Sequence, residues 1–144
     1  GTLCGSGPEF ERLRDAYPNL NFLGWCDKDV LAEQFKTTKA LVMTSSWYEA
    51  SPLVCLEAML TSGIPSIVPD TCGAIAYIKD GENGLLFKNG DASSLCEAIS
   101  KLEDSRYYEK LCESTSLSVP SLQEDRSYET YAKRVINLYE GLYV

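Results

Sequence analysis

The chain has 144 residues, of which 44% are hydrophobic, and its 13 basic and 21 acidic side chains give a net charge of −8. This length and composition predict one globular domain with its own core. The negative charge disfavours nucleic-acid binding and electrostatic contact with a membrane. Because the chain has no histidine, catalysis by histidine, by Ser-His-Asp or Cys-His groups, and most zinc sites are excluded.

The cysteines are widely spaced and form no CxxC pair, so we expect buried thiols in a reducing cytosol rather than disulfides or a metal cluster. They are Cys4, Cys26, Cys55, Cys72, Cys96 and Cys112. No apolar stretch approaches the roughly 20 residues of a membrane-spanning helix, and no signal sequence opens the chain. We expect a cytoplasmic domain without direct membrane contact, within a parent protein that is either soluble or peripheral at the inner face of the membrane.

Short apolar or β-branched runs alternate with longer helical ones, a pattern typical of a parallel sheet covered by helices. The expected strands are residues 2–4, 21–23, 40–43, 66–68 and 85–87, and the expected helices are 9–17, 29–36, 52–61 and a short one at 75–78. The sequence therefore predicts an α/β fold, a Rossmann-like parallel sheet of about five strands flanked by helices.

The remainder of the chain is predicted to be helical, as the C-terminal part (91–144) of one domain spanning residues 1–144. Helices are expected at 92–102, with Asp91 as N-cap, at 105–115 and at 124–142, with residues 114–121 as a connection. The aromatic stripe of the last helix, which includes Tyr128, Tyr131 and Tyr139, is either core or a surface for a partner domain. Since a strand begins at Thr2, we expect the domain to be truncated at its N-terminus.

The most informative segment is residues 40–69. A strand ends at Met43, a polar loop follows, and Ser51 and Pro52 open a helix as N-cap and first-turn proline. Ligands of open α/β sheets bind at this carboxyl edge, and the amides of a helix start favour an anion.

Two glutamates flank this helix start, Glu49 before it and Glu57 within it, with seven residues between them. Glu57 is expected near the stripe of Leu53, Leu56 and Leu60, where an unpaired carboxylate would be costly. Two neighbouring sugar hydroxyls would suit an ionised carboxylate. Alternatively, Glu49 favours the positive end of the helix dipole and Glu57 pairs with a basic residue.

The segment SSWYEASPLVCLEAMLTSGIPSIVPD resembles the donor-binding segment of glycosyltransferase family 4, the "group 1" family of retaining GT-B enzymes. CGSGPEFERL, FLGWCDKDVLAEQF and IKDGENGLLFKNGD match flanking family elements in the same order. The resemblance implies the C-terminal half of a GT-B fold. It also implies a parent enzyme that moves a hexose from a UDP- or GDP-sugar to a glycan or lipid-linked acceptor, with retention of configuration.

The resemblance further implies roles for single residues. Glu57 matches the glutamate that binds the ribose hydroxyls, and Glu49, the expected catalytic residue, matches the one near a hydroxyl of the donor sugar. Backbone amides then face the sugar and the diphosphate, a loop supports the base, and a GxGP turn lies beside the site. The matching residues are Ala50, Ser51, Leu53 and Val54 for the amides, Trp25, Cys26 and Asp27 for the loop, and Gly5 and Gly7 for the turn. No metal and no cofactor besides the nucleotide sugar is expected.

The chain also departs from the family pattern. The family's arginine and lysine for the diphosphate precede the GxGP strand, and the N-terminal acceptor domain is absent, so we expect the fragment to be inactive alone. Where many relatives read GGIPEII, this chain reads CGAIAYI at residues 72–78, with Ala76 in place of the glutamate.

A non-catalytic Rossmann-like module, whose helical C-terminus binds a partner, is the main alternative. A dinucleotide-binding oxidoreductase is disfavoured because Phe10 breaks the G-x-G-x-x-G pattern, and no Walker A sequence is present.

Overall fold

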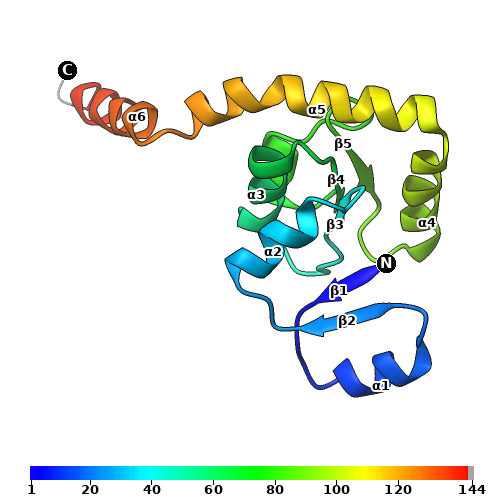
Figure 1. Cartoon of the computed structure of the whole chain (residues 1–144). Helices are drawn as coiled ribbons and strands as arrows, with labels where there is room; N and C mark the ends of the chain where they lie inside the picture. Colours follow the sequence, from blue (N-terminus) through cyan, green and yellow to red (C-terminus); the bar gives the residue numbers. More distant parts are fainter. Residues whose placement is uncertain (143–144) are drawn as a thin grey trace. The chain divides into compact units, whose positions relative to one another are not determined.

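The computed structural model of the chain describes residues 1–142 (Figure 1). It contains two compact units, Gly1–Thr37 and Thr38–Val144. Each unit has its own parallel sheet.

The first unit is built on a two-stranded sheet. Its elements are β1 (Thr2–Cys4), α1 (Phe10–Ala16), β2 (Asn21–Gly24) and α2 (Lys28–Phe35). The rings of Phe10 and Phe22 meet edge to face at 5.6 Å and join α1 to β2. Asp27 caps α2 by accepting a hydrogen bond from the Val30 amide at 2.9 Å, as expected for an aspartate at this position.

The second unit contains a three-stranded sheet in the order β3-β4-β5. Its elements are β3 (Leu41–Val42), α3 (Leu53–Ser62), β4 (Ser66–Pro69), η1 (Gly73–Ala76), β5 (Gly84–Phe87), α4 (Ala92–Ser100), η2 (Lys101–Glu103), α5 (Ser105–Asp125) and α6 (Tyr128–Glu140). All pairs are parallel, so the three strands end at the same edge of the sheet.

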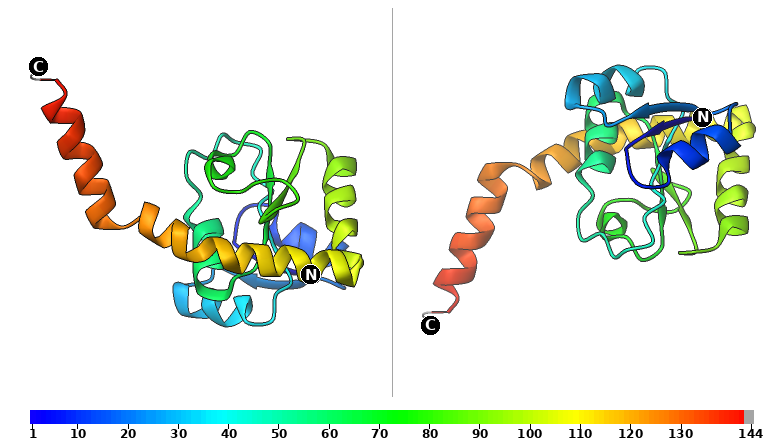
Figure 2. Two further views of the ribbon diagram at one scale, coloured as in Figure 1. Left: turned by 90° about the horizontal axis from the view of Figure 1, so that it is seen from above. Right: turned by 90° about the horizontal axis from the view of Figure 1, so that it is seen from below.

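The core of the second unit surrounds β4, whose four residues are all buried. Val68 packs with Cys55 and Met59 of α3, whereas Ile67 packs with Ala98 of α4. This division follows from the alternation of side chains along a strand. Accordingly, α3 and α4 lie on opposite sides of the sheet in both views (Figure 1 and Figure 2).

The five predicted strands are confirmed in position, with small shifts at their ends, but not as one sheet. β1 and β2 pair only with each other, and β3, β4 and β5 form the second sheet. Within residues 1–142, the α/β class and the parallel pairing follow the sequence pattern, whereas the division into two sheets was not predicted.

The connection predicted at residues 114–121 is wrong, because α5 is continuous and contains Pro120. Thr115 and Leu122 are buried on one face of this helix. Their burial outweighs the cost of a proline inside a helix, about 3 kcal/mol. As a result, the last helix begins at Tyr128 rather than at residue 124.

Of the two helix N-caps predicted from the sequence, one is confirmed and the other is wrong. Asp91 is confirmed as the N-cap of α4, since its carboxylate accepts from the amides of Ser93 and Ser94. Ser51 is not the N-cap of α3, because the helix begins at Leu53 and Pro52 occupies the cap position with extended backbone angles. The short helix expected at 75–78 is η1, which begins two residues earlier.

All six cysteines are free, as expected, but only two are buried. Cys55 and Cys72 lie in the core, whereas Cys4 and Cys96 are exposed. Cys26 and Cys112 are half-buried. The uniform burial predicted from apolar surroundings is wrong because neighbours along a helix point in different directions, as Cys96 and the buried Ala98 do.

The aromatic stripe of α6 is not part of the core. Tyr128 is 93% exposed and Tyr131 is 67% exposed, so the core interpretation of this stripe is wrong. No helix within residues 1–142 is long and apolar enough to cross a membrane.

Candidate functional site

Three loops meet at the carboxyl edge of the sheet β3-β4-β5. The first, residues 43–52, follows β3 and is called here the donor loop; the others follow β4 and β5. Hydrogen bonds from the second and third loops reach the donor loop at separate points. These contacts decide where Glu49 and the start of α3 lie.

Gly73, after β4, makes the tightest contact with the donor loop. Its amide donates to the Glu49 carbonyl at 2.6 Å. A Cβ atom at Gly73 would lie 1.9 Å from the Ala50 carbonyl oxygen. Only glycine fits this approach without a shift of backbone.

Asn89, after β5, holds the donor loop from the other side. Its side-chain amide donates to the Ser46 carbonyl at 3.3 Å, and its backbone amide donates to the Asp70 carboxylate at 3.0 Å. The ends of β4 and β5 are thereby joined to the loop after β3.

Tyr77 provides the third contact. This side chain is 9% exposed, and its hydroxyl donates to the Pro52 carbonyl at 3.3 Å. Burial raises the pKa of Tyr77, and the neighbouring Cys55 and Cys72 add to the shift. The phenol therefore remains a neutral donor at physiological pH.

The start of α3 is suited to a negatively charged ligand. Pro52 is the N-cap, and a proline side chain cannot accept a hydrogen bond from the first-turn amides. Ala50, Ser51 and Leu53 are exposed, Val54 is half-buried and Pro52 is buried, so the residues on either side of Pro52 are accessible. Amides at a helix N-terminus and the helix dipole together favour anions.

The two predicted glutamates lie on either side of this helix start. Glu49 is half-buried, and its Oε1 accepts from the Ser45 hydroxyl at 3.3 Å. Glu57 is also half-buried, in the second turn of α3, where its carbonyl accepts from Thr61 at 2.7 Å. Both residues belong to the same unit as the predicted backbone amides.

The environment expected for Glu57 needs one correction. The buried face of α3 consists of Cys55, Ala58 and Met59. Leu56 and Leu60 of the predicted stripe are half-buried and pack against this core, whereas Leu53 is 65% exposed and does not belong to it. Glu57 therefore lies at the margin of the core.

The remaining predicted residues belong to the first unit. The Gly5 amide donates to the Gly24 carbonyl at 2.6 Å, and Gly5 has a φ of 146°, which favours glycine. The Gly7 carbonyl accepts from the amide of Phe10 at the start of α1. A mainly apolar pocket of about 280 Å³ adjoins this turn.

The turn after β2 lies close to the glycine turn. Trp25 is 84% exposed, and the Cys26 thiol contacts the Gly24 carbonyl at 3.5 Å. Partial desolvation of the Cys4 thiol, together with the neighbouring Cys26 thiol, raises the pKa of Cys4 to about 11, although the residue as a whole is exposed. The Asp27 carboxylate is already engaged as the cap of α2, so a structural role accounts for this residue.

Sequence reasoning missed the three residues that hold the donor loop. Gly73, Tyr77 and Asn89 are 24 to 43 positions from their partners in the chain, so no local spacing connects them. The glycine that follows β4 was the one available signal, because a glycine at such an edge often marks a close backbone approach. Among residues 1–142, no group of three His, Cys, Asp or Glu side chains could hold a metal ion.

The parallel sheets and the helices that flank them define an α/β protein with Rossmann-like architecture. Residues 2–116 match the family model described as "Glycosyl transferases group 1". The chain belongs to this family, and its structural neighbours are GT-B glycosyltransferases.

Two curated relatives are similar in sequence. An exopolysaccharide phosphotransferase of Streptomyces coelicolor is 34% identical over 107 residues, 69% of this chain and 11% of that protein. A GDP-mannose-dependent alpha-mannosyltransferase of Corynebacterium glutamicum is 28% identical over 139 residues, 95% of this chain and 32% of that protein. The chain thus spans about a third or less of these relatives.

Two solved structures illustrate the fold. Sucrose-phosphate synthase of Thermosynechococcus elongatus has a TM-score of 0.77 and 28% identity, over 99% of this chain and 38% of that one. Anabaena HepE in complex with UDP-glucose has a TM-score of 0.76 and 18% identity, over 97% of this chain and 40% of that one. The second similarity concerns the fold alone.

Proposed function

We propose that this chain is the nucleotide-sugar-binding domain of a retaining glycosyltransferase. The parent enzyme transfers a hexose from a UDP- or GDP-sugar to a glycan or lipid-linked acceptor. The observation that carries this proposal is the exposed start of α3, with Glu49 before it and Glu57 in its second turn. The GDP-mannose and UDP-glucose named for two similar proteins support this class of donor.

In this proposal, the amides of Ala50, Ser51, Leu53 and Val54 bind the donor sugar and the diphosphate. Glu57 accepts hydrogen bonds from the ribose hydroxyls, because an ionised carboxylate can accept from two neighbouring donors. Glu49 accepts from a hydroxyl of the transferred sugar and orients it. Ser45 keeps the Glu49 carboxylate in place through the hydrogen bond to Oε1.

The reaction breaks the bond between the anomeric carbon and a diphosphate oxygen, and the electron pair remains on the nucleoside diphosphate. The acceptor oxygen bonds to the same face of the anomeric carbon, and its proton passes to the departing diphosphate. The helix start stabilises the negative charge that develops on this leaving group. No metal ion is needed for these steps.

For the first unit, the proposal assigns Gly5 and Gly7 to the GxGP turn of the family and Trp25, Cys26 and Asp27 to the loop that supports the base. The resemblance assigns the cations for the diphosphate to a segment that precedes the GxGP strand, and the acceptor to an N-terminal domain of the parent enzyme. We propose that the 144 residues alone bind nucleotide weakly and transfer no sugar. The free cysteines are consistent with a cytoplasmic enzyme.

The experiment that tests this function compares Glu49→Gln and Glu57→Gln in the full-length natural protein that contains these residues. Glu49→Gln should lower kcat with little change in nucleotide affinity, whereas Glu57→Gln should weaken nucleotide binding. Glu113→Gln, at an exposed position of α5, is the control for the loss of one carboxylate. Unchanged kinetics in both test variants would contradict the proposed site.

A second candidate function is a non-catalytic module whose last helix binds a partner. The exposed aromatic stripe of α6, with Tyr128, Tyr131 and Tyr139, favours it. In that case Glu57 is structural, and Glu57→Gln should lower the melting temperature without affecting any nucleotide binding.

A further inference from the structure

We propose that Tyr77 is a positioning residue for the nucleotide-sugar site, and that Arg126 couples it to the junction of α5 and α6. This inference rests on the proposed function, because it concerns the start of α3 as the place where the diphosphate binds. Tyr77 touches no substrate; it acts through Pro52.

The first link joins Tyr77 to the start of α3. The Tyr77 hydroxyl donates to the Pro52 carbonyl at 3.3 Å, and this carbonyl also accepts from the Cys55 amide at 3.2 Å. Pro52 immediately precedes α3, the helix whose first amides bind the diphosphate in the proposed function. A change in the Tyr77 hydroxyl therefore alters the restraint on that helix start.

The second link fixes the backbone of Tyr77. Its carbonyl accepts from the side-chain amide of the buried Asn83 at 2.9 Å. The Thr115 hydroxyl of α5 has one proton for two acceptors, the Leu111 carbonyl at 2.7 Å and the Asn83 carbonyl at 3.2 Å. Tyr77 is thus held through its backbone by Asn83, beside α5, and through its side chain by Pro52.

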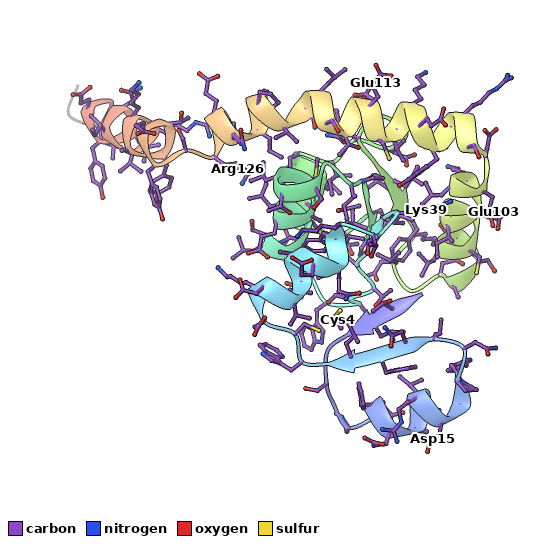
Figure 3. All side chains as sticks on the ribbon, viewed as in Figure 1. Cys4, Asp15, Lys39, Glu103, Glu113 and Arg126 are labelled. Atoms are coloured by element: carbon purple, nitrogen blue, oxygen red, sulfur yellow. The ribbon has the colours of Figure 1, made fainter. Side chains whose placement is uncertain are left out.

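The third link is Arg126, which Figure 3 labels at the junction of α5 and α6. Its guanidinium lies over the Tyr77 ring, 5.1 Å from the ring centroid, within the range of a cation–π interaction. Asp125 forms an ion pair with Arg126 at 3.5 Å and a second one with Arg134 of α6. A continuous set of contacts therefore connects α6 with the start of α3.

The contacts of Tyr77 use both its hydroxyl and its ring. An aliphatic side chain would fill space but would donate no hydrogen bond and offer no ring to a guanidinium. The contacts to Pro52 and Arg126 therefore depend on the tyrosine itself.

The structure supplies a matched control, Tyr108. Its hydroxyl donates to the Lys39 carbonyl at 3.0 Å, and the Lys39 ammonium lies 5.2 Å from its ring centroid. Lys39 precedes β3, at the edge of the sheet opposite to the donor loop. Tyr77→Phe and Tyr108→Phe thus remove the same kind of hydrogen bond at opposite edges of one sheet.

The test measures the Kd for UDP and for GDP, together with the melting temperature, in the full-length natural protein that contains these residues. Tyr77→Phe should weaken nucleotide binding about two- to tenfold, the loss expected for one neutral hydrogen bond. Tyr108→Phe should lower the melting temperature to a similar extent and leave Kd unchanged. Arg126→Met should also weaken binding and should add little in the Tyr77→Phe background.

Glu57→Gln is measured in parallel, so that the inference and the proposed function can fail separately. If Glu57→Gln loses binding while Tyr77→Phe binds like the wild type, the role of Tyr77 is overturned and the function stands. Equal weakening by Tyr108→Phe also overturns it, because general destabilisation would then explain the effect. If Glu57→Gln has no effect, or the wild type binds neither nucleotide, both proposals fall.

Discussion

The amide of Gly73 donates to the carbonyl of Glu49 at 2.6 Å, and this hydrogen bond joins the loop after β4 to the loop after β3. The contact brings two backbones so close that no side chain fits between them. The position of Glu49 thus depends on a residue 24 positions further along the chain, and any donor bound at the start of α3 depends on it too.

Replacing Gly73 by alanine is expected to destabilise the protein and to disturb the donor loop. The new Cβ would lie 1.9 Å from the Ala50 oxygen and 2.5 Å from its carbonyl carbon, so the backbone must move. Overpacking of this kind costs about 1–3 kcal/mol. Urea denaturation measures the loss in the free energy of unfolding.

Gly141→Ala is the control for this substitution. A Cβ atom at Gly141 would meet its nearest neighbour at 3.4 Å, and φ there is −70°, so we expect a change within about 0.5 kcal/mol. Equal stability of the Gly73→Ala variant and the wild type would show that the close approach to Ala50 does not exist in solution.

Pro120→Ala is expected to stabilise the protein, because Pro120 lies inside α5. The proline removes a helical hydrogen bond and crowds the carbonyl of Ser116, at a cost of about 3 kcal/mol. The alanine variant recovers part of this stability. It also loses about 0.4–1 kcal/mol of stability, because its unfolded chain has more conformational freedom. We expect a net gain of about 1–2 kcal/mol in chemical denaturation.

Pro18→Ala is the control for the increased conformational freedom of the unfolded chain. Pro18 lies in a turn after α1, so its replacement relieves no cost inside a helix. This control should lower stability slightly. A Pro120→Ala variant that is no more stable than the wild type would contradict a continuous α5.

Stability is expected to fall as the pH rises above about 9. Burial raises the pKa of Cys55 from its ordinary value of 9.0 to about 12. Between these values, the unfolded chain releases a proton that the folded chain keeps, so unfolding becomes more favourable with rising pH. Below pH 9 both states hold the proton, and the contribution of Cys55 to stability is complete.

Urea denaturation at pH 8 and at pH 11 tests this dependence. The Cys55→Ala variant is the reference, because it lacks the thiol but keeps the other titrating groups. Its loss of stability between the two pH values should be smaller than that of the wild type. Equal losses would show that the Cys55 thiol is not buried.

The extent to which the sequence predicts this fold differs from feature to feature. The cap at Asp91 follows from residue type and local spacing alone, because the aspartate and the Ser93 and Ser94 amides are neighbours in the chain. The strands also followed from local composition. Helix α5 did not, since the burial of Thr115 and Leu122 overrides the local signal of Pro120.

The residues of the candidate site also differ in whether the sequence predicts them. Glu49, Glu57 and the helix start between them could be found from spacing and from the family resemblance. The contacts of Gly73, Tyr77 and Asn89 could not, because each of these residues reaches the donor loop through the fold. The Ser51 cap failed for a local reason: the backbone of Pro52 is extended, with ψ at 104°, so the helix starts one residue later.

The most direct test of the central claim is a calorimetric titration of UDP, and then of GDP, into the full-length natural protein that contains these residues. The wild type and the Glu113→Gln control should bind one nucleotide with the same affinity. The Glu57→Gln variant should lose this binding while its circular dichroism spectrum and melting temperature remain those of the wild type. Binding by Glu57→Gln that equals the wild type would contradict a ribose site at Glu57, and binding of neither nucleotide by the wild type would contradict a nucleotide-sugar site altogether.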